Sequence, residues 1–157
     1  MKIIEKYLRD QRILVKTPFI EEEYSYPATD ESGFCVFFSK ETGKCLVHEV
    51  KPETCRAGPV TFDINLKTAK IEWFLKKSEI CAFSETLQQE GSAFENHFEL
   101  ARREIIRLIR ELDQRALFAI LKIEEPQTIK IHEDIAQASV LKKLSFKSSK
   151  HPCLKTD

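Results

Sequence analysis

Four of the five cysteines in this chain of 157 residues fall within one stretch, Gly33–Phe83. The same stretch contains three of the four glycines and the only tryptophan. Successive cysteines are separated by nine, nine and twenty-five residues, at positions Cys35, Cys45, Cys55 and Cys81. Since no pair has the two-residue spacing of a zinc knuckle, spacing alone does not identify a zinc site. We expect the four thiols to converge on one metal site; the alternative is that they are small buried hydrophobic side chains.

The composition is that of one compact domain without a membrane span. With 42% apolar residues, a chain of this length can bury a core without disulfide support. Lys+Arg and Asp+Glu are both 25, a balance that argues against specific nucleic-acid binding. No stretch approaches about 18 consecutive apolar residues, and the N-terminus is charged where a signal peptide has its apolar core. We therefore expect a cytoplasmic protein, in which clustered cysteines more often bind metals than form disulfides.

Two β-hairpins and a helical turn are predicted around the cysteines. Alternating residues from Phe34 to Phe38 predict a first hairpin, with Cys35 on its first strand and Cys45 at the start of its second. Pro52 favours the beginning of a helical turn that contains Cys55. A second hairpin is predicted at 60–75, and its alternating apolar side chains would form one buried face: Val60, Phe62, Ile64, Ile71, Trp73 and Leu75.

The remaining segments predict helices and a polar tail. Apolar spacing predicts helices at 2–14, 94–112, 115–123 and 131–144, with Asp113 as the cap of the third. Residues 15–32, which contain the acidic run Glu21–Glu23, are expected to be irregular. His97 and His132 are expected to be ordinary helix-surface residues. His151 and Cys153 lie in the tail, where Cys153 would be a free thiol.

These elements predict an α+β fold. A small cysteine-rich unit at 30–83 would surround one metal site, packed with amphipathic helices from a helical part at 84–144. Residues 1–157 would form a single domain, ending in a mobile tail at 145–157. The helical part is expected to form a core layer or, alternatively, a docking surface for a protein partner.

The segment KCLVHEVKPETCR resembles the hallmark of the YkgJ-like cysteine-cluster family, whose members are described as zinc- or iron-chelating domains. The residues that carry the resemblance are Cys45, His48, Glu49, Lys51, Pro52, Cys55 and Arg56. The upstream GFCVFF supplies Cys35, and Cys81 matches the later single cysteine of the family. Residues 1–34 contain no cysteine, whereas many family members carry a further cysteine group there, so this chain would be a short form of the family.

The resemblance implies a metal site but leaves the metal open. Four thiolates can hold one tetrahedral zinc or one iron–sulfur cluster. His48 could replace one cysteine as a ligand, although a role in packing or outside the ligand shell is the more expected one. Arg56 could donate hydrogen bonds toward the thiolates, or form a surface ion pair instead.

Three function classes remain open from the sequence. The first is a metal-binding protein whose four-cysteine site is structural or stores metal. The second is a redox or methyl-transfer enzyme that uses an iron–sulfur cluster, and the residues do not decide whether the chain is an enzyme. The third is an interaction module in which the metal is purely structural.

Overall fold

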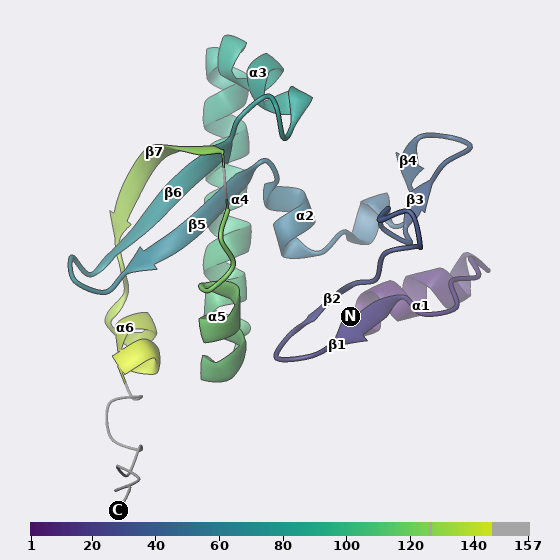
Figure 1. Cartoon of the computed structure of the whole chain (residues 1–157), viewed down its shortest axis with the longest axis horizontal. Coiled ribbons are helices and arrows are strands. Elements are labelled where there is room, and N and C mark those ends of the chain that lie inside the picture. Colours follow the sequence, from purple (N-terminus) through teal and green to yellow (C-terminus); the bar gives the residue numbers. More distant parts are fainter. Residues whose placement is uncertain (126, 146–157) are drawn as a thin grey trace, which may run out of the picture. The chain divides into compact units, whose positions relative to one another are not determined.

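The computed structural model describes residues 1–125 and 127–145 (Figure 1). They form two compact units, residues 1–56 and the described residues from Ala57 onward. Both units combine helices with small antiparallel sheets, which is the mixed character that the sequence predicts. No helix within the described residues is long and apolar enough to cross a membrane. Of the predicted tail, residues 146–157, with His151 and Cys153, lie outside the described residues.

The first unit begins with α1 (Lys2–Asp10), whose buried side chains Ile4 and Leu8 pack with Phe37 and Val47. The spacing of four residues between Ile4 and Leu8 puts both on one face of the helix, which explains why α1 forms here. The helix ends earlier than predicted. Leu14, the last residue of the helix predicted at 2–14, lies beyond α1 and is 99% exposed.

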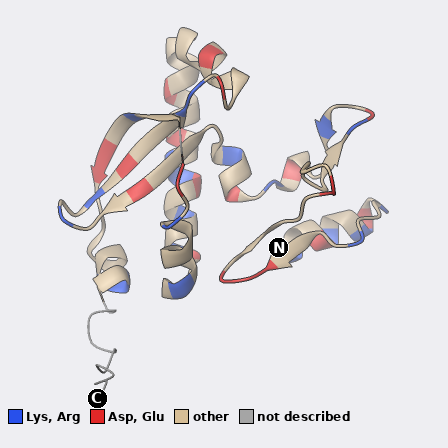
Figure 2. Cartoon of the chain, in the orientation of Figure 1, with Lys and Arg blue, Asp and Glu red and all other residues tan. Residues whose placement is uncertain are grey.

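The segment predicted as irregular contains a short hairpin, and this prediction is corrected. Strands β1 (Phe19–Glu21) and β2 (Ser25–Pro27) pair antiparallel. The acidic run at the hairpin tip is exposed, as expected of a solvated charge run. Figure 2 shows this tip as a continuous acidic segment, whereas acidic and basic residues alternate along α1.

The cysteine-bearing part of the first unit consists of very short elements. Strands β3 (Phe38–Ser39) and β4 (Lys44–Cys45) form a two-stranded sheet. A 3₁₀ turn, η1 (His48–Val50), leads to α2 (Glu53–Ala57), which reaches the boundary between the units. The helical turn predicted after Pro52 is therefore present.

The second unit is built around a three-stranded antiparallel sheet in the order β5-β6-β7. β5 (Val60–Asn65) and β6 (Lys70–Lys76) lie where the apolar alternation predicted them. The third strand, β7 (Thr128–Ile135), pairs with β6 in a segment where the sequence predicted the first part of a helix. The prediction of a helix at 131–144 is therefore wrong for residues 131–135, and α6 occupies Ala138–Ser145.

Three helices complete the second unit: α3 (Ala82–Gln89), α4 (Gly91–Glu111) and α5 (Gln114–Ile120). Helix α4 lies beside the sheet (Figure 1), and its stripe residues Ala101, Ile105 and Ile109 belong to the same buried cluster as Trp73. Asp113 caps α5 as predicted, because its Oδ1 accepts a hydrogen bond of 2.8 Å from the Ala116 N–H. The helix ends at Ile120, three residues earlier than expected.

Candidate metal centre

The first cysteine lies in a tight turn and not on a strand, which corrects the prediction for the first hairpin. The Cys35 carbonyl accepts a hydrogen bond of 2.8 Å from the Phe38 N–H, three residues later. Backward along the chain, Cys35 forms an isolated bridge with Thr29. The turn reverses the chain directly before β3 and leaves the Cys35 side chain exposed.

The second cysteine ends the hairpin that follows this turn. Cys45 is the last residue of β4, not the first residue of a longer strand, and its partner in β3 is Phe38. The hairpin loop closes through the Gly43 N–H, which donates to the Ser39 carbonyl at 2.8 Å. Gly43 has a φ of +67°, a conformation that glycine adopts without steric cost. Cys45 is half-buried and packs against the apolar cluster of the first unit.

The third cysteine lies on α2, ten residues after Cys45. Pro52 precedes the helix, and its carbonyl accepts a hydrogen bond of 3.0 Å from the Arg56 N–H. Proline suits this position because the first helical turn does not use its N–H. Cys55 is in the middle of α2, and its side chain is exposed.

Cys35 and Cys45 lie near enough to Cys55 to act on its thiol electrostatically. Partial desolvation raises the pKa of the Cys55 thiol, and the neighbouring Cys35 and Cys45 raise this pKa further. Lys51 and a hydrogen bond with Thr54 act in the opposite direction on the same pKa. Three thiols from a turn, a strand and a helix therefore share one neighbourhood. Their thiolates would repel one another, and a soft cation would relieve that repulsion, so the donor set fits zinc or iron.

The side chains do not form a closed ligand shell. Within residues 1–125 and 127–145, no group of three or more His, Cys, Asp or Glu side chains is arranged to hold a metal ion. The four cysteines described are free thiols. The backbone thus brings Cys35, Cys45 and Cys55 to one neighbourhood without converging their sulfur atoms.

The fourth predicted ligand belongs to the second unit. Cys81 is half-buried and occupies the N-cap position of α3. Its N–H donates to the Lys77 carbonyl at 3.0 Å, and its carbonyl accepts from the Ser84 N–H at 2.9 Å. These backbone bonds fix the chain at the start of the helix.

The two further candidates of the sequence are both exposed. His48 begins η1, three residues after Cys45, and its ring is accessible to solvent. Arg56 follows Cys55 in α2 and is also exposed. Both therefore lie on segments that carry or adjoin a cysteine of the first unit.

One residue that sequence reasoning missed organises the loop before Cys35. Asp30 accepts hydrogen bonds of 2.9 Å from the N–H groups of Ser32 and Phe34, and it forms an ion pair of 2.7 Å with Lys40. The Lys40 hydrogen bond and the two backbone bonds lower the pKa of the Asp30 carboxyl. An aspartate two residues before Ser32 is a known signal for an Asx turn, so the sequence did contain a local indication of this loop.

Two histidines differ from the expected helix-surface role. His97 is half-buried on α4, with Nε2 at 3.2 Å and 3.0 Å from the carbonyl oxygens of Ala57 and Gly58. His132 lies on β7, not near the start of a helix, and its ring packs edge-on against Phe98. Both partners are distant in the sequence, so periodicity could not have revealed these contacts.

Comparison with known proteins supports the interpretation that the segment with the cysteines belongs to a metal-chelating domain. The model of the CxxCxxCC family, described as "Putative zinc- or iron-chelating domain", matches residues 4–86, which is more than half of the 157 residues. This is the YkgJ-like family that the segment around Cys45 and Cys55 resembles. The match covers nearly all of the first unit and ends within α3. We found no significant match among curated proteins or among solved structures.

Proposed function

Because the chain belongs to the CxxCxxCC family of zinc- or iron-chelating domains, we propose that Cys35, Cys45 and Cys55 bind one metal centre, with Cys81 as the fourth ligand. The centre is one zinc ion or one iron–sulfur cluster. Its role in this proposal is structural or storage, since four thiolates leave no open position for a substrate on zinc.

The observation that carries the proposal is the shared neighbourhood of three thiols in the first unit. Each thiol lies on a different local structure: the Cys35 turn, the end of β4 and the middle of α2. Such short elements bury little apolar surface, and the core cluster of this unit is small: among the described residues it consists of the buried side chains Ile4, Leu8, Phe37 and Val47. A metal would contribute folding free energy that so small a core does not supply.

The surrounding charges are compatible with a thiolate centre. Metal binding requires the thiols to lose their protons, and Lys51 favours the thiolate form of Cys55. Partial desolvation of Cys55 and the nearby sulfurs of Cys35 and Cys45 oppose ionisation of the free thiol. A bound zinc ion would replace these protons and supply tetrahedral coordination, whereas a cluster would add electron transfer.

The test is elemental analysis of protein purified without oxygen, combined with an absorption spectrum and acid-labile sulfide. We expect about one zinc per chain without a visible band, or iron and sulfide in equal amounts with a visible band. Single changes of Cys35, Cys45 or Cys55 to Ser should lower the metal content and the melting temperature. Cys153→Ser is the matched control, because the sequence predicts that thiol to be free. Unchanged metal content in all three single variants would contradict the proposal.

The enzyme alternative uses the same residues and differs only in the metal. A redox or methyl-transfer reaction would need the iron–sulfur form, so a visible band would favour it and a colourless zinc protein would not.

The interaction-module alternative has less support. Arg102 binds Asp134, Arg107 binds Glu104 and Arg110 binds Gln137, so these arginines of α4 are engaged within the chain.

A further inference from the structure

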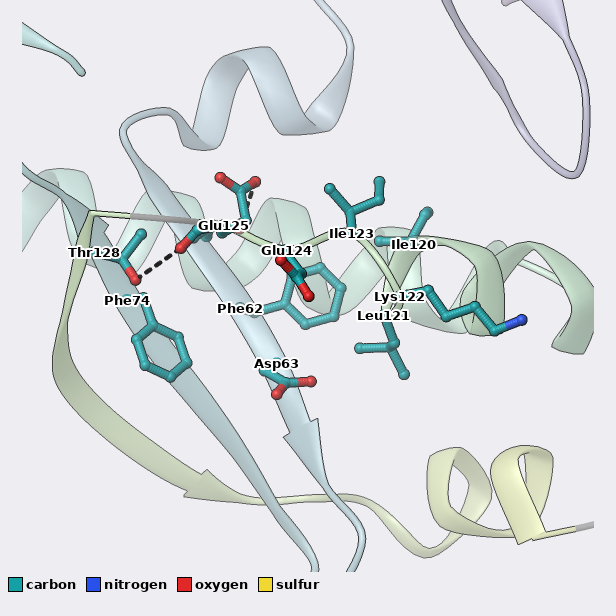
Figure 3. A pocket seen from close by; sticks show the side chains of 11 residues that line it. Phe62, Asp63, Phe74, Ile120, Leu121, Lys122, Ile123, Glu124, Glu125 and Thr128 are labelled. Carbon is teal, nitrogen blue, oxygen red and sulfur yellow. Dashed lines mark hydrogen bonds between the residues drawn. The ribbon is translucent and has the colours of Figure 1, made fainter.

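The second unit contains a pocket of about 460 Å³ that includes no cysteine. It lies between strands β5 and β6 and the segment that ends α5 and continues to Glu125 (Figure 3). Its volume falls in the range of about 300 to 1,000 Å³ that is typical of small-molecule sites. The residues that line it are Thr61, Phe62, Asp63, Phe74, Thr128 and the run 120–125.

Apolar side chains contribute much of the lining. Phe62 packs against Trp73, with ring centroids 6.5 Å apart, and belongs to the margin of the main core. Leu121 also packs against this core and is half-buried. Because these side chains are held by the core, the pocket offers a preformed apolar surface for the body of a ligand.

One of the three carboxylates in the pocket is already neutralised by its neighbours. Glu125 forms an ion pair with Lys76 at 3.0 Å and accepts a hydrogen bond from Thr61 Oγ1 at 3.5 Å. The Thr128 hydroxyl donates to the Glu125 carbonyl at 3.3 Å, which fixes this part of the segment. Glu125 therefore forms part of the wall.

The other two carboxylates have no cationic partner among the described residues. Asp63 Oδ1 accepts a hydrogen bond of 2.7 Å from the Ile64 N–H, which leaves its second oxygen available. Glu124 is exposed at the rim. Lys122 is the one cation among the described lining residues, and Figure 3 shows its side chain extending away from Asp63 and Glu124. The pocket consequently combines an apolar surface with uncompensated negative charge.

We propose that this pocket binds a small organic cation: a primary amine carried on an aryl or alkyl body. The body would contact Phe62 and Leu121, and the ammonium group would pair with Asp63 and Glu124. An anion of the same size would be repelled by the two carboxylates. A neutral molecule would cover the carboxylates without giving them a partner, which costs free energy. The site is independent of the thiols of the first unit, so it extends the proposed function.

The first test uses phenethylamine as the probe and the full-length protein in its purified form. Amide shifts are followed by NMR, with 2-phenylethanol and 3-phenylpropionate as neutral and anionic molecules that have the same aryl body. We expect phenethylamine to shift the amides of Thr61, Leu121 and Glu124 at lower concentration than the other two, and added salt to weaken its binding. Equal binding of the amine and the alcohol, or no shift of these amides at millimolar amine, would overturn the proposal.

The second test uses variants that remove charge but keep shape. Glu124→Gln and Asp63→Asn should each weaken phenethylamine binding about three- to tenfold, as is typical of a charged contact that is partly open to solvent. Glu111→Gln, an exposed change outside the pocket lining, is the matched control and should leave binding unchanged. If Glu111→Gln weakens binding as much as the pocket variants do, binding depends on the overall charge of the protein and the proposed site is refuted. If neither pocket variant weakens binding, the site is refuted as well.

Discussion

Phe38 and Cys45 lie directly opposite each other in the β3–β4 pairing, and the Phe38 N–H closes the turn that begins at Cys35. Directly opposed residues in antiparallel strands have Cα atoms about 4.5 to 5.5 Å apart. One aromatic residue therefore joins the backbone segments that carry the first two cysteines. The proximity of these thiols is a consequence of backbone hydrogen bonds and does not require a metal.

The fourth ligand is the part of the proposed centre that variants can test most sharply. We expect Cys81→Ser to lower metal affinity by more than the about 10- to 100-fold typical of changes outside the ligand shell. His48→Ala should stay within that range, because we assign His48 no bond to the metal. Affinity is measured by competition with a chromogenic chelator. A larger loss of metal affinity for His48→Ala than for Cys81→Ser would mean that His48, and not Cys81, is the fourth ligand.

The Asp134 carboxylate is expected to be the most important polar group of the second unit. It accepts hydrogen bonds from Trp73 Nε1 at 2.7 Å and from Arg102 Nε and Nη2 at 2.9 and 2.8 Å. Trp73 is 0% exposed, so loss of this acceptor would leave its N–H without a partner. We expect Asp134→Ala to lower the free energy of unfolding by about 2–4 kcal/mol in urea denaturation.

The matched control for Asp134→Ala is Asp134→Asn, which keeps one oxygen acceptor for Trp73 but loses the charge that pairs with Arg102. Asp134→Asn should lower the free energy of unfolding by less than Asp134→Ala does. Equal costs for the two variants would mean that the ion pair, and not the Trp73 hydrogen bond, determines the effect.

The pH dependence of stability should include a contribution from Glu133. Hydrogen bonds from Lys70 and Lys130 lower the pKa of this carboxyl from 4.5 to about 2. A depressed carboxyl pKa stabilises the folded state above the unfolded-state value, and this stabilisation is lost as the pH falls from about 4.5 toward 2. Thermal melts of the wild type and Glu133→Gln should therefore differ at pH 6 and converge near pH 2. A constant difference across this range would contradict the assignment.

Lys143 on α6 should stabilise the C-terminal end of α4. Its Nζ donates to the carbonyl oxygens of Ile109, Arg110 and Leu112 at 3.0, 3.1 and 2.5 Å. These carbonyls belong to the last turn and C-cap of the helix, where a cation also interacts favourably with the helix dipole. We expect Lys143→Met to lower the free energy of unfolding by about 1–2 kcal/mol.

The control for Lys143 is its neighbour Lys142, which is exposed on the same helix. Lys142→Met should change the free energy of unfolding by less than about 0.5 kcal/mol. Similar losses for the two variants would show that a general effect on α6 is responsible.

The sequence predicted best those elements whose pattern is local. The β5–β6 hairpin and the α4 stripe were predicted because strand and helix periods are visible in the residues themselves. Strand β7 was missed because Val140, Leu141 and Leu144 have a helical spacing that predicted a helix from residue 131, whereas the strand is selected by pairing with β6 across about 60 residues. A register shift between Trp73 and Phe74 further interrupts the alternation along this pairing.

For the candidate site too, the sequence predicted what a local pattern shows and missed what depends on contacts along the folded chain. The resemblance of the segment around Cys45 and Cys55 indicated the family, which the model match confirms. The Cys35 turn was mistaken for a strand because Phe34, Val36 and Phe38 alternate with it, although the Asp30 loop and the hydrogen bond to Phe38 bend the chain there. The ligand set stays a prediction, since metal coordination depends on sulfur positions that neither pattern nor backbone determines.

Cysteine thiolates hold the metal in the proposed centre, and X-ray absorption at the metal edge of protein purified without oxygen can detect them. We expect a shell of sulfur neighbours, at about 2.3 Å if the metal is zinc. Cys55→Ser should lose part of this shell, and Cys153→Ser should retain all of it. A shell made only of nitrogen and oxygen neighbours would contradict thiolate ligation.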